Sequence, residues 1–240
     1  MPLSVFVGPT LPAANRPADA EITYLPPASA GDMLALAKQP PHRVLLIDGI
    51  FEAARAPWHK EVLVLLAEGF DVWGAASLGA LRAAELYPFG MRREGNIADA
   101  YAAGRIIGDD EVAVAHAPGE FGHRALSLAQ VDVRATLASA LRIGLLTGAE
   151  ARHLRAASHA IFFKDRTMAS LIAAAAELLS DRAERFAAWL PTGFVSQKAR
   201  DAQAAIAAAA AAPFIRSDRA PPPETLFLKR LRDERPCPRD

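Results

Sequence analysis

Short apolar runs and amphipathic stretches alternate along the first half of the chain. Apolar runs bounded by turn residues predict strands at 3–7, 22–25, 43–48, 70–74 and 111–116. Stretches whose apolar residues recur at helical spacing lie at about 31–38, 56–68, 78–86 and 95–103. Uninterrupted apolar strands are expected where helices cover both faces of a sheet. The alternation therefore predicts an α/β fold with a Rossmann-like parallel sheet flanked by helices.

The pattern changes from about residue 125 onward, where long stretches of good helix formers carry helical periodicity. The predicted helices are 126–146, 149–162, 168–190 and 196–212. We therefore expect an α/β core over 1–124, followed by an all-helical C-terminal subdomain over 125–216. The remainder, 217–240, is rich in proline and charge, which predicts a disordered tail. Its stretch "TLFLKRL" (225–231) could dock on a partner.

Composition narrows the class of protein. The chain has 240 residues, 52% of them hydrophobic, which is enough for a sizeable core. It carries 27 basic and 27 acidic residues, and a net charge of zero does not favour broad binding to nucleic acid or to a membrane. The one cysteine, Cys237, excludes an internal disulfide and a cysteine metal cluster, and we expect neither a metal nor a cofactor. With no signal-peptide pattern and no apolar stretch long enough to span a bilayer, a cytoplasmic protein is expected.

Several unusual residues follow the predicted strands. In an open parallel sheet, ligands bind beside the carboxyl ends of the strands, where the following helices begin. The stretches "GPTLP" (8–12), "DGIFE" (48–52), "PWHKE" (57–61) and "GAASLG" (74–79) would all lie at that edge. Thr10, Asp48, His59 and Ser77 could therefore meet in one crevice.

Ser77 lies at the joint between a predicted strand and a predicted helix. Residues 75–79 nearly match the G-x-S-x-G pattern, with Ala75 in the first glycine place, and the strand–turn–helix context is the one that this motif requires. Serine is also a favoured helix N-cap, so a nucleophile and a simple cap are both open. The same turn lacks the Lys-Ser/Thr of a P-loop and the G-x-G-x-x-G fingerprint, so a phosphate site is only weakly signalled.

Candidate partners for Ser77 lie at the same edge. His59 can serve as a general base or pack beside Trp58, and Lys60 and Glu61 either form a solvated helix face or supply an activating ammonium and a partner contact. Asp48 can orient a base, cap a loop or bind a metal, and the metal is the weakest of these because no second acidic cluster is near.

Other charged residues have two interpretations each. Arg82 and Glu85 are three apart on one helix, so they can pair, or Arg82 can reach an anion. His116 ends a predicted strand and is a second candidate base. The remaining candidates are Lys164, Arg166 and Lys198, dense charges within apolar helices. They form either a buried ion-pair network or a basic cover over the Ser77 crevice that binds a carboxylate.

The chain resembles the TfuA-like family. The resemblance covers most of residues 3–205, and its motifs are "VFVGPTLP" (5–12), "LLIDGIFE" (45–52), "PWHKEVL" (57–63), "GAASLGALRAAEL" (74–86), "GMRREGNIADAY" (90–101) and "DDEVAVAH" (109–116). Family members often carry two serines where this chain has Ala76 and Ser77.

The resemblance implies a role beside a YcaO-type enzyme, which uses ATP to activate a peptide amide and, with a TfuA partner, installs a thioamide. The precursor peptide would be ribosomally synthesised, as in the production of a peptide antibiotic. The TfuA protein would release sulfide from a thiocarboxylated, ThiS-like carrier protein, or it would only recruit or activate the YcaO enzyme. A phosphate- or nucleotide-binding protein is the third hypothesis, and the oligomeric state, a homodimer included, is left open.

The hydrolytic hypothesis assigns a role to each candidate. Ser77 would attack the carbonyl carbon, one of His59, Lys60 and His116 would take its proton, and Asp48 would orient the base. The N–H groups near Thr10 and Leu78 would hold the oxyanion. The residues expected to bind substrate are Gly8, Thr10, Arg82, Glu85, His116, Lys164, Arg166 and Lys198.

Overall fold

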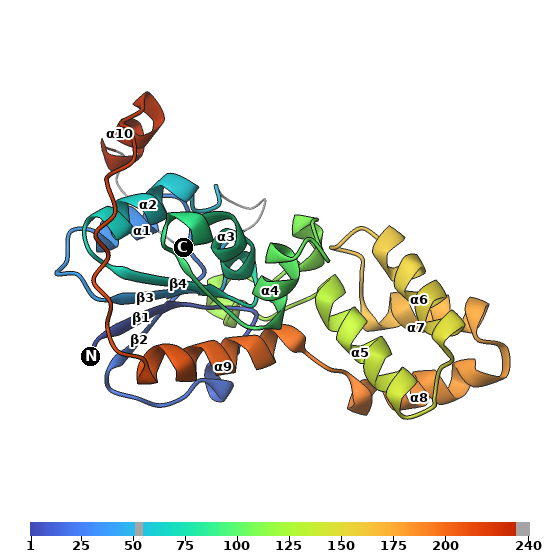
Figure 1. Cartoon of the computed structure of the whole chain (residues 1–240). Coiled ribbons are helices and arrows are strands. Elements are labelled where there is room, and N and C mark those ends of the chain that lie inside the picture. The colour runs from blue at the N-terminus through green and yellow to red at the C-terminus, as the bar shows by residue number, and fades with distance from the viewer. Residues whose placement is uncertain (51–54, 234–240) are drawn as a thin grey trace. The chain divides into compact units, whose positions relative to one another are not determined.

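The computed structural model describes residues 1–50 and 55–233, apart from the side chain of residue 180. The chain forms two compact units (Figure 1). The first unit, the sheet unit, comprises Met1–Ile107 and the chain from Ala199 onward, and the second, the helical unit, is Gly108–Lys198. No helix within the described residues is both long and apolar enough to cross a membrane.

A five-stranded sheet is the centre of the sheet unit. Its strand order is β2-β1-β3-β4-β5, and every neighbouring pair is parallel. The strands are β1 (Leu3–Phe6), β2 (Ile22–Leu25), β3 (Arg43–Leu46), β4 (Asp71–Ala75) and β5 (Arg92–Glu94). The predicted Rossmann-like α/β fold is confirmed. Strands β1, β3 and β4 are buried along their whole length, as their mainly apolar sequences indicated, and the buried polar residues among them are Ser4, Arg43 and Asp71.

The fifth strand is not the one predicted. Residues 111–116 lie outside the sheet: Asp109–Glu111 form a short 3-10 helix, and His116 makes only an isolated antiparallel bridge to Ala125. The fifth strand is instead β5, whose sequence is Arg-Arg-Glu. It pairs with β4 at the edge of the sheet, where half-buried polar residues are tolerated.

The helices that follow the strands have nearly the predicted bounds. They are α1 (Asp32–Leu36), α2 (His59–Ala67), α3 (Leu78–Leu86) and α4 (Asn96–Ala102). One core cluster joins Phe6, Val44 and Leu46 of the sheet to Val62 and Leu65 of α2. The apolar stripe of α2 thus covers one face of the sheet.

Helix α9 (Gln197–Ala211) covers the other face. Ala202, Ala205, Ile206 and Ala209 pack against a sheet cluster that includes Trp73. Small alanine side chains allow a helix to approach a sheet closely, which explains why this alanine-rich segment belongs with the sheet although the sequence placed it in the helical subdomain.

A buried ion pair fixes the end of α9. Arg43 donates from Nε to Asp71 (2.8 Å) and from Nη1 and Nη2 to the carbonyls of Ala212 (2.9 Å) and Pro213 (2.6 Å). A guanidinium bound to the carbonyls after the last turn complements the negative end of the helix dipole.

The helical unit contains four longer helices within its described part. They are α5 (Gln130–Arg142), α6 (Gly148–Ala160), α7 (Met168–Leu178) and α8 (Ala183–Gly193). Their core includes Val133, Leu137, Leu154, Leu171 and Phe186. The single helix predicted over 168–190 is two helices, because a 3-10 turn at Ser180–Arg182 separates α7 from α8. The expected disordered tail contains helix α10 (Leu226–Asp233). Cys237 lies outside the described residues.

Candidate functional site

Asp48 organises the loop that follows β1. Its buried carboxylate accepts the N–H groups of Gly8 (2.8 Å) and Thr10 (3.0 Å) on one oxygen and the Thr10 hydroxyl (2.5 Å) on the other. These three sequence-predicted residues are therefore brought together at the carboxyl ends of β1 and β3. The Thr10 N–H is committed to Asp48, so it is not free for the oxyanion role expected of it.

The turn between β4 and α3 lies directly on the end of β3. A Cβ atom at Gly79 would come within 1.8 Å of the Leu46 carbonyl oxygen, and the Gly79 N–H donates to the carbonyl of Ile47 (3.0 Å). A Cβ atom at Gly74 would in turn come within 2.2 Å of the Gly79 carbonyl oxygen. Both glycines are thus required by close backbone approach.

The start of α3 also meets two other loops of the same edge. A Cβ atom at Gly49 would lie 2.1 Å from Cδ2 of Leu78 and 3.2 Å from Cδ of Pro57. The loop after β3, the residues before α2 and the first turn of α3 are therefore neighbours. This is the crevice edge that the sequence predicted for the carboxyl ends of the strands.

The strained residue of the turn is Ala76. Its φ is +64°, and the Ser77 N–H donates to the Ala75 carbonyl (2.8 Å), which is the hydrogen bond of a γ-turn. Ser77 itself has a φ of −107°. In a nucleophile elbow the nucleophile occupies the strained position of the strand-to-helix turn. Here that position carries a methyl group, and the hydroxyl is one residue later.

Ser77 begins α3 but does not cap it. Its side chain makes no capping hydrogen bond, and within residues 1–50 and 55–233 its Oγ has no hydrogen-bond partner. The N–H of Leu78 likewise donates to no acceptor in that part of the chain. Ser77 is 7% exposed. A hydroxyl and a backbone N–H, both without a hydrogen-bond partner among the described residues, therefore lie together at the positive end of a helix dipole.

His59 pairs with Glu85, not with Asp48. Its Nε2 lies 2.7 Å from a carboxylate oxygen of Glu85, which also accepts a hydrogen bond from Arg82 (2.8 Å). The histidine and glutamate side chains are 46% and 38% exposed. Arg82 and Glu85 therefore form the predicted i, i+3 pair, and His59 extends it to the start of α2. Lys60 donates to the Pro223 carbonyl (3.2 Å) and the Thr225 hydroxyl (3.3 Å).

Glu61, for which a solvated helix face and a partner contact were both open, is fully buried. Its two oxygens accept the N–H groups of Trp58 (2.9 Å) and Gly31 (2.8 Å). Burial raises the pKa of the Glu61 carboxyl to about 7, against the lowering effect of its backbone hydrogen bonds. The sequence held no capping-box signal for this residue, because the N-cap position is Trp58 and not a serine or threonine.

Four predicted substrate-binding residues belong to the helical unit. His116 lies in a loop, where its Nδ1 is 2.9 Å from the Ala117 carbonyl oxygen and its ring contacts that of His123 at 5.5 Å between centroids. The exposed Lys164 lies near the rings of Phe162 and Phe163. Lys198 is buried and donates from Nζ to the carbonyl of Val112 (2.8 Å).

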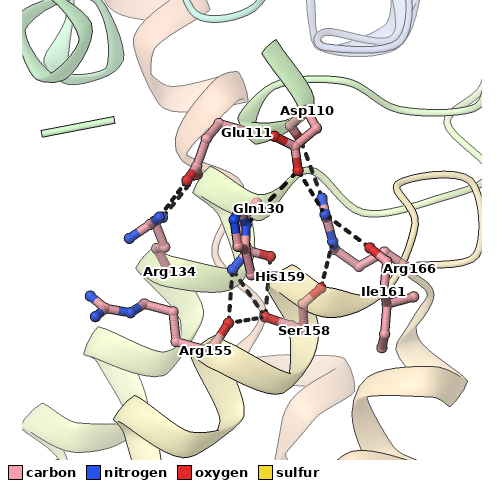
Figure 2. A network of polar contacts seen from close by, with 9 residues as sticks. All are labelled: Asp110, Glu111, Gln130, Arg134, Arg155, Ser158, His159, Ile161 and Arg166. Atoms are coloured by element: carbon pink, nitrogen blue, oxygen red, sulfur yellow. Dashed lines mark hydrogen bonds and ion pairs between the residues drawn. The ribbon is translucent and has the colours of Figure 1, made fainter. Parts of the chain in front are cut away.

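Arg166 is the centre of a buried polar network (Figure 2). It is 1% exposed and donates to the carbonyls of Ser158 (2.9 Å) and Ile161 (3.2 Å) and to the Asp110 carboxylate (3.3 Å). In the same network Arg134 holds the buried Glu111 through both carboxylate oxygens. For Arg166 this arrangement agrees with the first of the two interpretations, a buried ion-pair network. Its guanidinium donates hydrogen bonds to groups of the helical unit.

The chemistry at the crevice edge rests on hydroxyl, amide and carboxylate groups. Within the described residues, no group of three or more His, Cys, Asp or Glu side chains is arranged to hold a metal ion. The start of α3 offers a hydroxyl and an N–H to an anionic group or a carbonyl carbon. Arg82 and Glu85 of α3 form a polar cluster with His59, the first residue of α2.

A family model described as TfuA-like protein matches residues 48–167, which are 120 of the 240 residues. The match begins at Asp48 and ends beside Arg166, so it spans the turn before α3 and the polar network of the helical unit. The comparison with curated proteins finds no match. The resemblance inferred from the motifs is thereby confirmed.

Proposed function

The chain belongs to the TfuA-like family, and on that premise we propose that it delivers sulfide to a YcaO-type enzyme for the ATP-dependent thioamidation of a ribosomally synthesised peptide. Proteins of this family are partners of YcaO proteins. The sulfur source in this proposal is the thiocarboxylated C-terminus of a ThiS-like carrier protein. The single observation that carries the delivery role is the start of α3, where the Ser77 hydroxyl and the Leu78 N–H are both free of internal partners among the described residues.

A thiocarboxylate fits such a helix start. It is an anion with two acceptor atoms, and the first turn of a helix offers N–H groups and the positive end of the helix dipole. Because Ser77 does not cap α3, its hydroxyl can turn toward a bound group without breaking a hydrogen bond to any of the residues that the structure describes. The loop held by Asp48 forms the neighbouring wall at the same edge of the sheet.

Release of sulfide would then proceed through Ser77. Its Oγ attacks the carbonyl carbon of the thiocarboxylate, the C–S bond breaks, and the carrier becomes an ester of the serine. The hydroxyl proton ends on the departing sulfur, so hydrosulfide leaves. Water next hydrolyses the ester, which returns the serine and the carrier carboxylate. Transfer of the proton to the substrate's sulfur fits a serine that has no titratable hydrogen-bond partner among the described residues.

Recruitment without catalysis is the second candidate, and two observations favour it. The strained elbow position carries Ala76, which has no nucleophile, and His59 is occupied by Glu85. In that case the chain would hold the YcaO enzyme and the carrier together, and Ser77 would contribute at most one hydrogen bond to the bound carrier.

The two candidates are separated by Ser77→Ala in a reconstituted reaction with the YcaO enzyme, ATP, precursor peptide and thiocarboxylated carrier. Release through Ser77 predicts loss of most hydrosulfide production and of most thioamide formation from the carrier, with thioamide formation rescued when free sulfide replaces the carrier. An unchanged rate with Ser77→Ala would exclude the nucleophile and leave recruitment. Ala76→Ser is the matched control, since it adds a hydroxyl one residue away at the strained position.

A further inference from the structure

The topology of the sheet indicates where a ligand should bind. In the strand order β2-β1-β3-β4-β5, the chain passes from β1 outward to β2 and then crosses back to β3. Strands β1 and β3 are therefore neighbours whose following segments depart in opposite directions along the sheet. In open parallel sheets of this order, ligands bind beside the carboxyl ends of two such strands. The expected position is thus between the loop that follows β1 and the loop that follows β3.

Arg16 lies on the β1 side of this position. It is half-buried, and its Nε and Nη2 donate to the carbonyls of Leu11 (3.0 Å) and Val7 (3.2 Å), which belong to the loop that follows β1. Its guanidinium carbon lies over the ring of Tyr24 in β2, 5.4 Å from the ring centroid. These contacts fix the guanidinium at the carboxyl ends of β1 and β2.

The charge of Arg16 is not neutralised by a contacting carboxylate. It forms no ion pair with any described residue, and its two hydrogen bonds are with uncharged carbonyl groups. The carboxylate of Asp48 acts on it electrostatically, but that carboxylate accepts its hydrogen bonds from Gly8 and Thr10. Burial is the largest effect on the guanidinium, and it lowers the pKa of Arg16. Since Nη1 donates to none of the described residues, the guanidinium can still donate to a bound anion.

The loop that holds Arg16 packs beside the turn that precedes Ser77. Val7 and Leu11, whose carbonyls accept from Arg16, share one core cluster with Ala76. The first turn of α3 lies on the carboxyl end of β3, and β3 is the neighbour of β1. The remaining N–H groups of Arg16 and the hydroxyl of Ser77 therefore belong to adjacent parts of the same edge of the sheet.

We propose that Arg16 is a further substrate-binding residue, which pairs with the anionic C-terminal group of the carrier protein whose carbon Ser77 attacks. This inference rests on the proposed function, because it takes the carrier as the ligand of this edge. The start of α3 offers the partial positive charge of the helix dipole, and Arg82 of the same helix already pairs with Glu85. Arg16 supplies a full positive charge, and the planar arrangement of its N–H groups fits the two acceptor atoms of a carboxylate or thiocarboxylate.

The test measures binding of the ThiS-like carrier in two forms, one that ends in a carboxylate and one that ends in a carboxamide. Each form is titrated into wild type, Arg16→Gln and the matched control Arg93→Gln, which removes a positive charge from an ion pair with Asp99. For the carboxylate form we expect Arg16→Gln to weaken binding by about ten-fold or more, as for the loss of a hydrogen bond to a charged group. Arg93→Gln should bind both forms as wild type does.

The carboxamide form distinguishes anion binding from a structural role. It should bind wild type about ten-fold more weakly than the carboxylate form does, and Arg16→Gln should then cause no further loss. Arg16→Lys, which keeps the charge, should recover part of the affinity for the carboxylate form alone. An equal loss for both forms with Arg16→Gln would show that Arg16 only holds the loop, and it would overturn the proposal. Equal binding of both forms to wild type, or no binding of either form, would overturn it as well.

Failure of this inference is distinguishable from failure of the proposed release of sulfide. Hydrosulfide production with Ser77→Ala judges the release and does not depend on Arg16. If Ser77→Ala releases sulfide normally while Arg16→Gln weakens only the carboxylate form, Arg16 remains a carrier-binding residue and the nucleophile is rejected. If Ser77→Ala abolishes release while Arg16→Gln affects both forms alike, the nucleophile remains and the role of Arg16 is rejected.

Discussion

The buried Glu61 makes the stability of the sheet unit depend on pH. Its carboxyl is fully buried, accepts the N–H groups of Trp58 and Gly31, and has a pKa raised to about 7 by desolvation. In the unfolded chain the same group titrates near 4.5. The folded state therefore binds a proton that the unfolded state has already lost, across the pH range between these two values.

The sign and size of the effect follow from that difference. The contribution to stability is fully present below pH 4.5 and is lost as the pH rises through 7, where the buried carboxyl must become charged. One pKa unit corresponds to 1.36 kcal/mol, so a rise from 4.5 to about 7 corresponds to about 3 kcal/mol. Between pH 5 and 7 the contribution should fall by about 1.4 kcal/mol per pH unit.

Glu61→Gln isolates this contribution because glutamine keeps the shape and does not titrate. Urea unfolding of both chains at several pH values between 5 and 8 gives the difference in their free energies of unfolding. Other groups titrate in both chains and cancel in that difference. We expect the wild type to lose about 2.5 kcal/mol relative to the variant from pH 5 to 8, since the first part of the change already occurs below pH 5. A difference that stays constant over this range would refute the buried, proton-binding carboxyl.

Three further substitutions test the packing of the site and of the helical unit. Gly79→Ala should destabilise the chain by at least about 2 kcal/mol in urea unfolding, since its Cβ would come within 1.8 Å of the Leu46 carbonyl oxygen. Asp48→Ala should cost about 2 kcal/mol and shift the amide NMR signals of Gly8 and Thr10, because it removes the acceptor of both N–H groups and of the Thr10 hydroxyl. Arg166→Ala should lower the thermal stability of the helical unit at a cost of about 3 kcal/mol or more, by leaving buried carbonyls without donors. No change in the measured quantity would contradict each expectation.

A strand of the sheet could be predicted where burial on both of its faces requires mainly apolar residues. β1, β3 and β4 are mostly apolar, and their polar residues are Ser4, Arg43 and Asp71. β5 has no such signature because it is a short edge strand of charged residues, so the apolar run at 111–116 was taken for it instead. α9 was misplaced because helical periodicity identifies a helix and not the surface on which it packs.

The sequence predicted where the site lies, at the carboxyl ends of the strands, but it predicted fewer of the contacts between its side chains. The topology of a parallel sheet placed Gly8, Thr10 and Asp48 together, as the structure has them. The sequence did not predict that His59 contacts Glu85. That contact depends on the directions in which the side chains of α2 and α3 point. The burial of Glu61 follows from the docking of residues 28–31 against α2, which no local pattern encodes.

The most direct test of the account is the rate of thioamide formation by the purified YcaO-type enzyme with ATP, precursor peptide and thiocarboxylated carrier, measured with and without this chain. The account predicts that the chain accelerates the reaction when the carrier is the sulfur source and gives little acceleration when free sulfide is supplied in excess. The same rate with and without the chain, carrier being the only sulfur source, would contradict it.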